Sequence, residues 1–148
     1  MVIFYLLSGD AGGLPVCDGP ARYAYQGPTT RKQVGLMLRI ARGRWGFLTY
    51  RSGLVLPHEI LQGQQGGLRR QTLDARRAWA EWVYPKLRAR LSQVECVEAV
   101  AFLASRVYHA DLAPWLVRDL GVRVLCPLDN LSGAEQGAWI RAQAAGAQ

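Results

Sequence analysis

Short apolar runs alternate with longer amphipathic stretches along this chain, and this alternation is what most restricts its fold. The amphipathic stretches place apolar residues at three- and four-residue spacing, which is typical of helices with one buried face. Alternating strands and helices predict an α/β fold, here a three-layer sandwich with a mostly parallel sheet of about four strands and helices on both faces. The expected strands are residues 2–7, 44–50, 97–104 and 122–125.

The expected helices begin at residues that favour helix caps. Thr29 or Thr30 is expected to cap the first helix. Trp79 and Trp82 fall on the apolar side of the longest helical pattern, so both are expected to pack in the core. Pro85 lies inside the same pattern and is expected to kink the helix or split it, because proline removes a backbone hydrogen bond. The expected helices are residues 29–43, 72–91, 111–120 and 132–144.

Glycine and proline mark the connecting segments. Residues 14–28 contain three prolines and are expected to form an extended loop. Residues 9–13 are glycine-rich, which fits either a phosphate-binding turn of exposed backbone N–H groups or a plain connecting loop. Residues 62–71 are expected to be a flexible loop, in which Arg69 and Arg70 either contact an anion as part of a lid or lie in solvent.

The chain is long enough for one domain with its own core. Its 148 residues are half hydrophobic, which argues against disorder, and only the tail 145–148 is expected to fray. No apolar run approaches the roughly 20 residues that span a bilayer. The apolar run 2–7 is too short for a signal peptide, so a cytoplasmic protein without membrane contact is expected.

Charge and cysteine content bear on the partners. The formal net charge is +7, and arginine supplies 16 of the 18 basic residues. Because guanidinium groups bind phosphates and carboxylates in a bidentate fashion, nucleic acid or an acidic protein surface is a plausible partner. Cys17, Cys96 and Cys126 form no CxxC motif, and His58 and His109 are not near them in sequence. No disulfide framework, no metal site and no cofactor is therefore expected.

Polar residues follow three of the expected strands. Carboxyl ends of parallel strands lie at one edge of a sheet, where ligand sites of open α/β folds are found. His58 and Glu59 resemble a general base with a carboxylate beside it, although such a pair is also common in a turn. Glu59, His58 and Asp10 are therefore the candidate catalytic residues. The candidate ligand-binding residues are Ser8, Gly9, Tyr50, Arg51, Ser52, Gly53, Ser105, Arg106 and Tyr108.

Several segments resemble a bacterial and phage family of unknown function. In this family a strand ends in a Ser-Ala-Lys-x-Gly-Leu turn before an acidic Pro-x-Glu segment, and the chain has WGFLTYRSGLVLPHEIL at residues 45–61. The likeness continues through ARRAWAEWVYPKL, VAFLASRVYHADLAPWL and VRVLCPLDNLSGAEQGAWI, and covers residues 25–141. The matching positions are Ser52, Gly53, Leu54, Glu59 and Tyr108.

The resemblance implies a role connected with nucleobases. The family is distantly similar to uracil-DNA-glycosylase-like α/β domains and to the accessory domain of archaeosine tRNA transglycosylases. It implies binding of a nucleobase or nucleotide, with cleavage of an N-glycosidic bond as the reaction if the domain is an enzyme. The chain departs from the family's Ser-Cys-x-x-Lys turn, having Ser-Gly-Asp-Ala-Gly at residues 8–12, and has Arg51 in place of the lysine of the second motif.

Three functional hypotheses follow. The first is a domain that binds or processes a nucleobase or nucleotide at the carboxyl edge of the sheet. The second is a non-enzymatic regulator, for example phage-encoded, that binds a protein of the transcription or repair machinery such as host RNA polymerase. The third is an α/β domain whose polar turns only terminate its strands.

Overall fold

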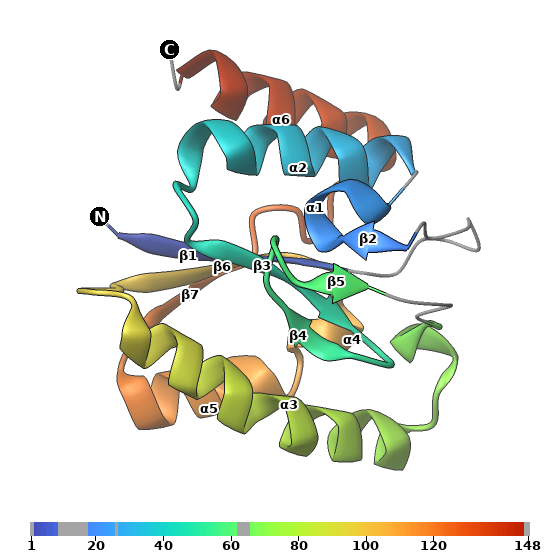
Figure 1. Ribbon diagram of the computed structural model, residues 1–148, viewed down its shortest axis with the longest axis vertical. Coiled ribbons are helices and arrows are strands. Elements are labelled where there is room, and N and C mark those ends of the chain that lie inside the picture. The colour runs from blue at the N-terminus through green and yellow to red at the C-terminus, as the bar shows by residue number, and fades with distance from the viewer. Residues whose placement is uncertain (1, 9–17, 26, 62–65, 147–148) are drawn as a thin grey trace.

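A five-stranded sheet forms the centre of the protein, in a computed structural model that describes residues 2–8, 18–25, 27–61 and 66–146 (Figure 1). The strand order is β4-β3-β1-β6-β7. The four predicted strands are present and pair in parallel: β1 (Ile3–Ser8), β3 (Trp45–Thr49), β6 (Ala99–Leu103) and β7 (Arg123–Leu125). The fifth strand, β4 (Gly53–Val55), was not predicted, and it pairs antiparallel with β3 at the edge of the sheet.

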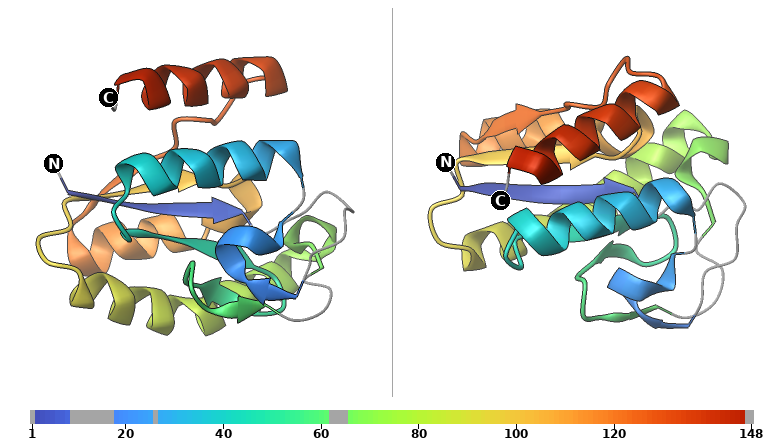
Figure 2. Two further views of the ribbon diagram at one scale, coloured as in Figure 1. Left: turned by 45° about the horizontal axis from the view of Figure 1, so that its top comes forward. Right: turned by 90° about the horizontal axis from the view of Figure 1, so that it is seen from above.

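Helices cover both faces of the sheet, as predicted (Figures 1 and 2). α2 (Pro28–Ile40) and α6 (Gly133–Gly146) lie side by side on one face, and α3 (Leu73–Gln93) and α5 (Leu112–Leu120) lie on the other. Every residue of β3 and β6 is buried, because both faces of these strands are covered. Two apolar cores result, one between the sheet and each helical layer.

The predicted helix ends are largely correct. Ser132 and Glu135 form a capping box at the predicted start of α6, in which the Glu135 N–H donates to Ser132 Oγ at 3.2 Å and the Ser132 N–H donates to Glu135 Oε1 at 3.1 Å. α6 continues to Gly146, two residues into the tail that was expected to fray. α3 runs unbroken through Pro85, so of the two expected effects of this proline the split does not occur. The threonines do not cap α2, whose N-cap is Gly27 and whose first residue is Pro28.

Two segments that were predicted to be loops contain short regular elements. β2 (Gly19–Pro20) and α1 (Ala21–Ala24) lie in the expected loop 14–28, and β2 pairs antiparallel with β5 (Ile60–Leu61). The 3₁₀ helix η1 (Leu68–Arg70) lies in the expected loop 62–71. A further short helix, α4 (Arg106–His109), follows β6. Propensity patterns do not reveal elements this short, because contacts with distant residues stabilise them.

The order of the strands creates a crevice between β1 and β6. The chain leaves β1 through α2 on one face of the sheet, and it leaves β6 through α4 and α5 on the opposite face (Figure 1). Neighbouring strands whose connections diverge in this way leave a gap at their carboxyl ends, and α/β proteins bind ligands in such gaps. No helix among the described residues is long and apolar enough to cross a membrane.

Candidate functional site

A cleft of about 480 Å³ opens at the carboxyl ends of β1 and β6. It lies at the crevice that the strand order creates, with Ser8 at the end of β1 on one side and Ser105 after β6 on the other. The start of α2, η1, the loop after β7 and the first turn of α6 complete the wall. The lining residues are Ser8, Thr29, Thr30, Gln33, Arg69, Leu103, Ala104, Ser105, Arg106, Leu128, Asp129, Asn130, Leu131 and Gln136.

One part of the cleft is suited to an anion. Arg69 and Arg106 line it from η1 and α4, and both side chains are exposed. Thr29 and Thr30 line it from the first turn of α2, whose Gly27 cap provides no side-chain acceptor. The N–H groups of a helix's first turn have no partners within the helix, and the helix dipole is positive there. Two guanidinium groups and a helix start therefore contribute positive potential to one wall.

The wall also contains polar groups that can form further hydrogen bonds. The Oγ of Ser105 is buried and has no hydrogen-bond partner among the described residues. Gln33 lines the cleft although only 5% of its surface is exposed. Side-chain amides of Asn130 and Gln136 add both donors and acceptors. Buried polar groups are nearly always paired in folded proteins, so an unpaired hydroxyl in a cleft is consistent with a ligand that pairs it.

A second polar cluster adjoins the cleft through Asp129. His109 Nε2 lies 3.4 Å from Asp129 Oδ1, and its Nδ1 lies 3.9 Å from Cys126 Sγ. Burial, together with the Asp129 carboxylate, raises the pKa of the Cys126 thiol. A thiol with a raised pKa is a poor nucleophile. The cluster therefore does not resemble an activated cysteine, but its three side chains are all potential metal ligands.

Three of the predicted site residues line the cleft, namely Ser8, Ser105 and Arg106. Gly9 and Asp10 lie outside the described residues. Tyr108 is 1% exposed and packs in the core beneath η1, where its hydroxyl accepts a 3.4 Å hydrogen bond from the Leu68 N–H. Tyr108 therefore supports the segment that contains Arg69 and does not line the cleft itself.

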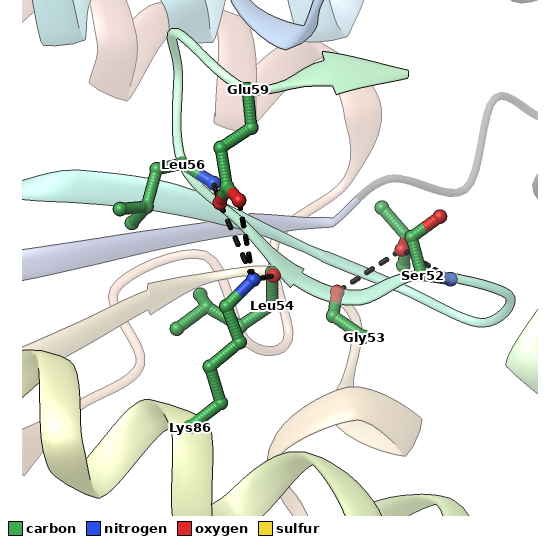
Figure 3. Close-up of polar contacts among 7 residues, drawn as sticks. Ser52, Gly53, Leu54, Leu56, Glu59 and Lys86 are labelled. Carbon is green, nitrogen blue, oxygen red and sulfur yellow. Dashed lines mark hydrogen bonds and ion pairs between the residues drawn. The ribbon is translucent and has the colours of Figure 1, made fainter. Parts of the chain in front are cut away.

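The predicted ligand-binding residues from Tyr50 to Gly53 form the turn between β3 and β4 (Figure 3). The buried hydroxyl of Thr49 fastens this turn, since it donates to the Gly53 carbonyl at 3.0 Å and accepts from the Ser52 N–H at 3.1 Å. Arg51 and Ser52 are exposed, and none of the turn residues lines the cleft.

Glu59 and His58 follow β4, which carries the chain back from the carboxyl edge of the sheet. Glu59 Oε1 accepts a 2.7 Å hydrogen bond from the Leu56 N–H and lies 3.3 Å from Lys86 Nζ (Figure 3). The same ammonium group donates to the Leu54 carbonyl at 2.7 Å. Glu59 thus joins the turn after β4 to α3, and neither Glu59 nor His58 is part of the cleft wall.

We expect replacement of Glu59 by alanine to reduce stability and to leave the cleft intact. The variant loses an ionic acceptor for the Leu56 N–H, so the free energy of unfolding should fall by about 1–2 kcal/mol in urea titrations. Glu59→Gln is the control, because it retains an oxygen for Leu56 and loses only a half-exposed ion pair, which contributes about 0–1 kcal/mol. Full stability of E59A together with loss of ligand binding would support the catalytic role predicted for Glu59.

The arginines of α3 are partly committed to structure. Arg76 donates to the carbonyls of Leu68 and Arg69, at 3.3 and 2.6 Å. Arg77 lies over the ring of Trp115, with 5.8 Å between the guanidinium carbon and the ring centroid. Some of the arginines therefore make contacts within the protein, so the number of arginines overstates the positive surface that could bind a polyanion.

Sequence reasoning missed most of the polar lining. Thr29, Thr30 and Gln33 were assigned only to a helix, and the residues after β7 were assigned to a loop. One signal was available, since Pro28 marks a helix start without a capping side chain. Arg69 was considered as an anion contact, and it does line the cleft.

Comparison with known proteins identifies the family. No curated protein and no solved structure matches the chain. Residues 17–142 match the model of a family described as a family of unknown function (DUF6884). Because the match covers most of the chain, the protein belongs to this family of unknown function.

Proposed function

We propose that the protein binds a nucleotide in the cleft between β1 and β6. The observation that carries this proposal is the position of the cleft at the point where connections leave the sheet on opposite faces. Nucleotides bind at this point in many doubly wound α/β proteins. The groups that line the cleft support the same class of ligand.

The phosphate would occupy the wall formed by Arg69, Arg106 and the start of α2. Guanidinium groups pair with phosphate oxygens in a planar, charge-assisted geometry. Free N–H groups at a helix start provide further donors, and the hydroxyls of Thr29 and Thr30 lie beside them. This combination favours a phosphorylated ligand over an unphosphorylated nucleoside.

The base would lie against the amide-bearing part of the wall. Gln33, Asn130 and Gln136 offer both donors and acceptors, which the edge of a nucleobase requires. The volume of about 480 Å³ lies within the range of about 300–1,000 Å³ that is typical of small-molecule sites. One mononucleotide is the ligand size that this volume suits.

Cleavage of an N-glycosidic bond is the reaction that the family resemblance implies. Such a reaction needs a carboxylate or an amide that holds the attacking water near the sugar carbon. In the cleft the Asn130 amide is available for this role. Release of free base from a bound nucleotide, followed by chromatography, tests this reaction separately from binding, with Asn130→Ala as the variant expected to lose it.

The binding test compares matched arginine variants. Thermal unfolding and calorimetric titration would use nucleoside monophosphates, the corresponding nucleosides and free bases, each at two salt concentrations. Arg69→Gln and Arg106→Gln remove the two guanidinium groups of the cleft. Arg39→Gln is the control, since Arg39 is exposed near the opposite end of α2.

We expect a monophosphate to raise Tm more than its nucleoside does. Each cleft variant should weaken binding by about tenfold or more, because a hydrogen bond to a charged group contributes about 1.5–3 kcal/mol. Arg39→Gln should leave the affinity unchanged. Equal losses in all three variants, or a shift produced by any polyanion at low salt only, would mean non-specific attraction to a basic surface and would contradict the proposal. No shift with any of these compounds would contradict it as well and favour a protein partner.

A further inference from the structure

We propose that His109, Cys126 and Asp129 form a binding site for a zinc ion beside the cleft. One donor atom from each of the three side chains can be chosen so that all three lie within 4.8 Å of one another. Thiolate, imidazole and carboxylate together are a ligand set that zinc prefers. The proposal does not rest on nucleotide binding, because it concerns different side chains apart from the shared Asp129.

A tight turn brings two of the ligands together. The Asp129 N–H donates to the Cys126 carbonyl at 3.2 Å, which closes a four-residue turn with Pro127 in its second position, where proline is favoured. The Cys126 thiol and the Asp129 carboxylate both contribute a donor atom to the cluster. This spacing, Cys-x-x-Asp, equals the Cys-x-x-Cys spacing by which many zinc sites obtain two of their ligands.

His109 would supply the third ligand from α4, at the start of the connection from β6 to β7. Its side chain is 9% exposed, and its ring lies 5.3 Å from that of Phe102, which restricts the position of the imidazole. Cys126 and Asp129 lie at opposite ring nitrogens, at 3.9 and 3.4 Å. Ligands of a tetrahedral zinc ion are about 3.5 Å apart. Coordination by one ring nitrogen therefore requires the donor at the other nitrogen to move toward the coordinating one.

The site would adjoin the cleft, since Asp129 lines it. Three protein ligands with one open position are characteristic of zinc sites that bind water or substrate. A cation would also offset the repulsion between the Asp129 carboxylate and a Cys126 thiolate. The site would thus place a Lewis acid at the wall that lies beside Asn130.

Cobalt(II) provides a direct readout of the thiolate ligand. The full-length protein, prepared with a chelator and then freed from it, would be titrated with Co²⁺ while the thiolate-to-cobalt charge-transfer band is recorded in the near ultraviolet. Zn²⁺ would then be added to displace the cobalt. We expect a band that saturates at one equivalent and disappears when zinc is added, and we expect zinc to raise Tm.

Cysteine variants identify the ligand. Cys126→Ser should abolish the band, whereas Cys96→Ser, at an exposed position, and Cys17→Ser should retain it. Asp129→Asn should retain the band but weaken zinc binding by about tenfold or more. Circular dichroism of each variant without metal checks that it folds. Asp129→Asn, at a half-buried position, keeps the test decisive if Cys126→Ser does not fold. Absence of the band in the wild type, its persistence in Cys126→Ser, or unchanged zinc affinity of Asp129→Asn would each overturn the proposal.

Discussion

Replacement of Trp79 by alanine is expected to cost the protein a large part of its stability. Trp79 is 4% exposed, and its indole N–H donates to the carbonyl of Thr49 at 2.9 Å. Its ring packs edge to face with Tyr108, with 5.6 Å between the centroids. Truncation of a buried tryptophan leaves a cavity that costs about 3–5 kcal/mol, and the Thr49 carbonyl loses its partner as well. Domains of this kind are stable by only about 5–15 kcal/mol.

Urea titrations of two further variants separate these contributions. Trp79→Phe keeps most of the packing and removes the N–H donor, so its loss should be about 1–3 kcal/mol. Trp82→Ala is the matched control on the same helix, because Trp82 is 58% exposed and should cost less than about 1 kcal/mol. Similar losses for Trp79→Ala and Trp82→Ala would mean that the core does not depend on the contact of α3 with the end of β3.

The two tryptophans also show how far a periodic pattern predicts burial. Both fall on the apolar stripe of α3, and both were predicted to pack in the core, but only Trp79 does. The Trp82 ring lies against Gly53 in the short edge strand β4. This strand is too short to cover the whole ring, so much of the side chain stays exposed. Periodicity predicts which face of a helix points toward the core, but it does not predict how much of that face other elements cover.

The main architecture could be predicted because its signals are local. Each parallel strand is a separate apolar run, and the start of α6 carries its own capping side chains, Ser132 and Glu135. β4 could not be predicted in this way, since its three residues are too few to show a period. Because β4 was not predicted, the positions of His58 and Glu59 were not predicted either. The chain reverses after β3 and runs back in β4, so these two residues do not lie at the carboxyl edge of the sheet.

The cleft and the proposed metal ligands depend on contacts between distant segments. Thr29 and Asn130 line the same cleft although they are far apart in sequence, and their proximity follows only from the strand order. The absence of CxxC motifs argued against zinc, but that argument considers only neighbours in sequence. The fold brings His109 to the Cys126–Asp129 turn, and in the proposed zinc site a carboxylate would take the place of the second cysteine.

Addition of a single methyl group at Gly53 is expected to destabilise the protein strongly. Its φ of +69° places it in the left-handed region, as a glycine at the end of a hairpin turn often is. A Cβ there would lie 3.2 Å from Val83 Cγ2 and 3.2 Å from the Trp82 ring. The exposed Trp82 ring can move, but Val83 is 2% exposed and is held by the core. The backbone strain and the contact with Val83 therefore act together, and we expect Gly53→Ala to cost about 2–3 kcal/mol.

Gly121 provides the matched control for this prediction. Its φ of +63° is nearly the same, but a Cβ there would meet nothing within 4 Å. Gly121→Ala should therefore cost only the conformational part, about 1–2 kcal/mol in chemical denaturation. The difference between the two variants measures how firmly β4 is packed against α3. If the two losses of stability are equal, Val83 and Trp82 can move to accommodate the added methyl group at no cost in stability. Glycine is then required at position 53 only because of the backbone conformation of the turn. If Gly53→Ala instead abolishes nucleotide binding at unchanged stability, the ligand-binding role predicted for this residue would be supported.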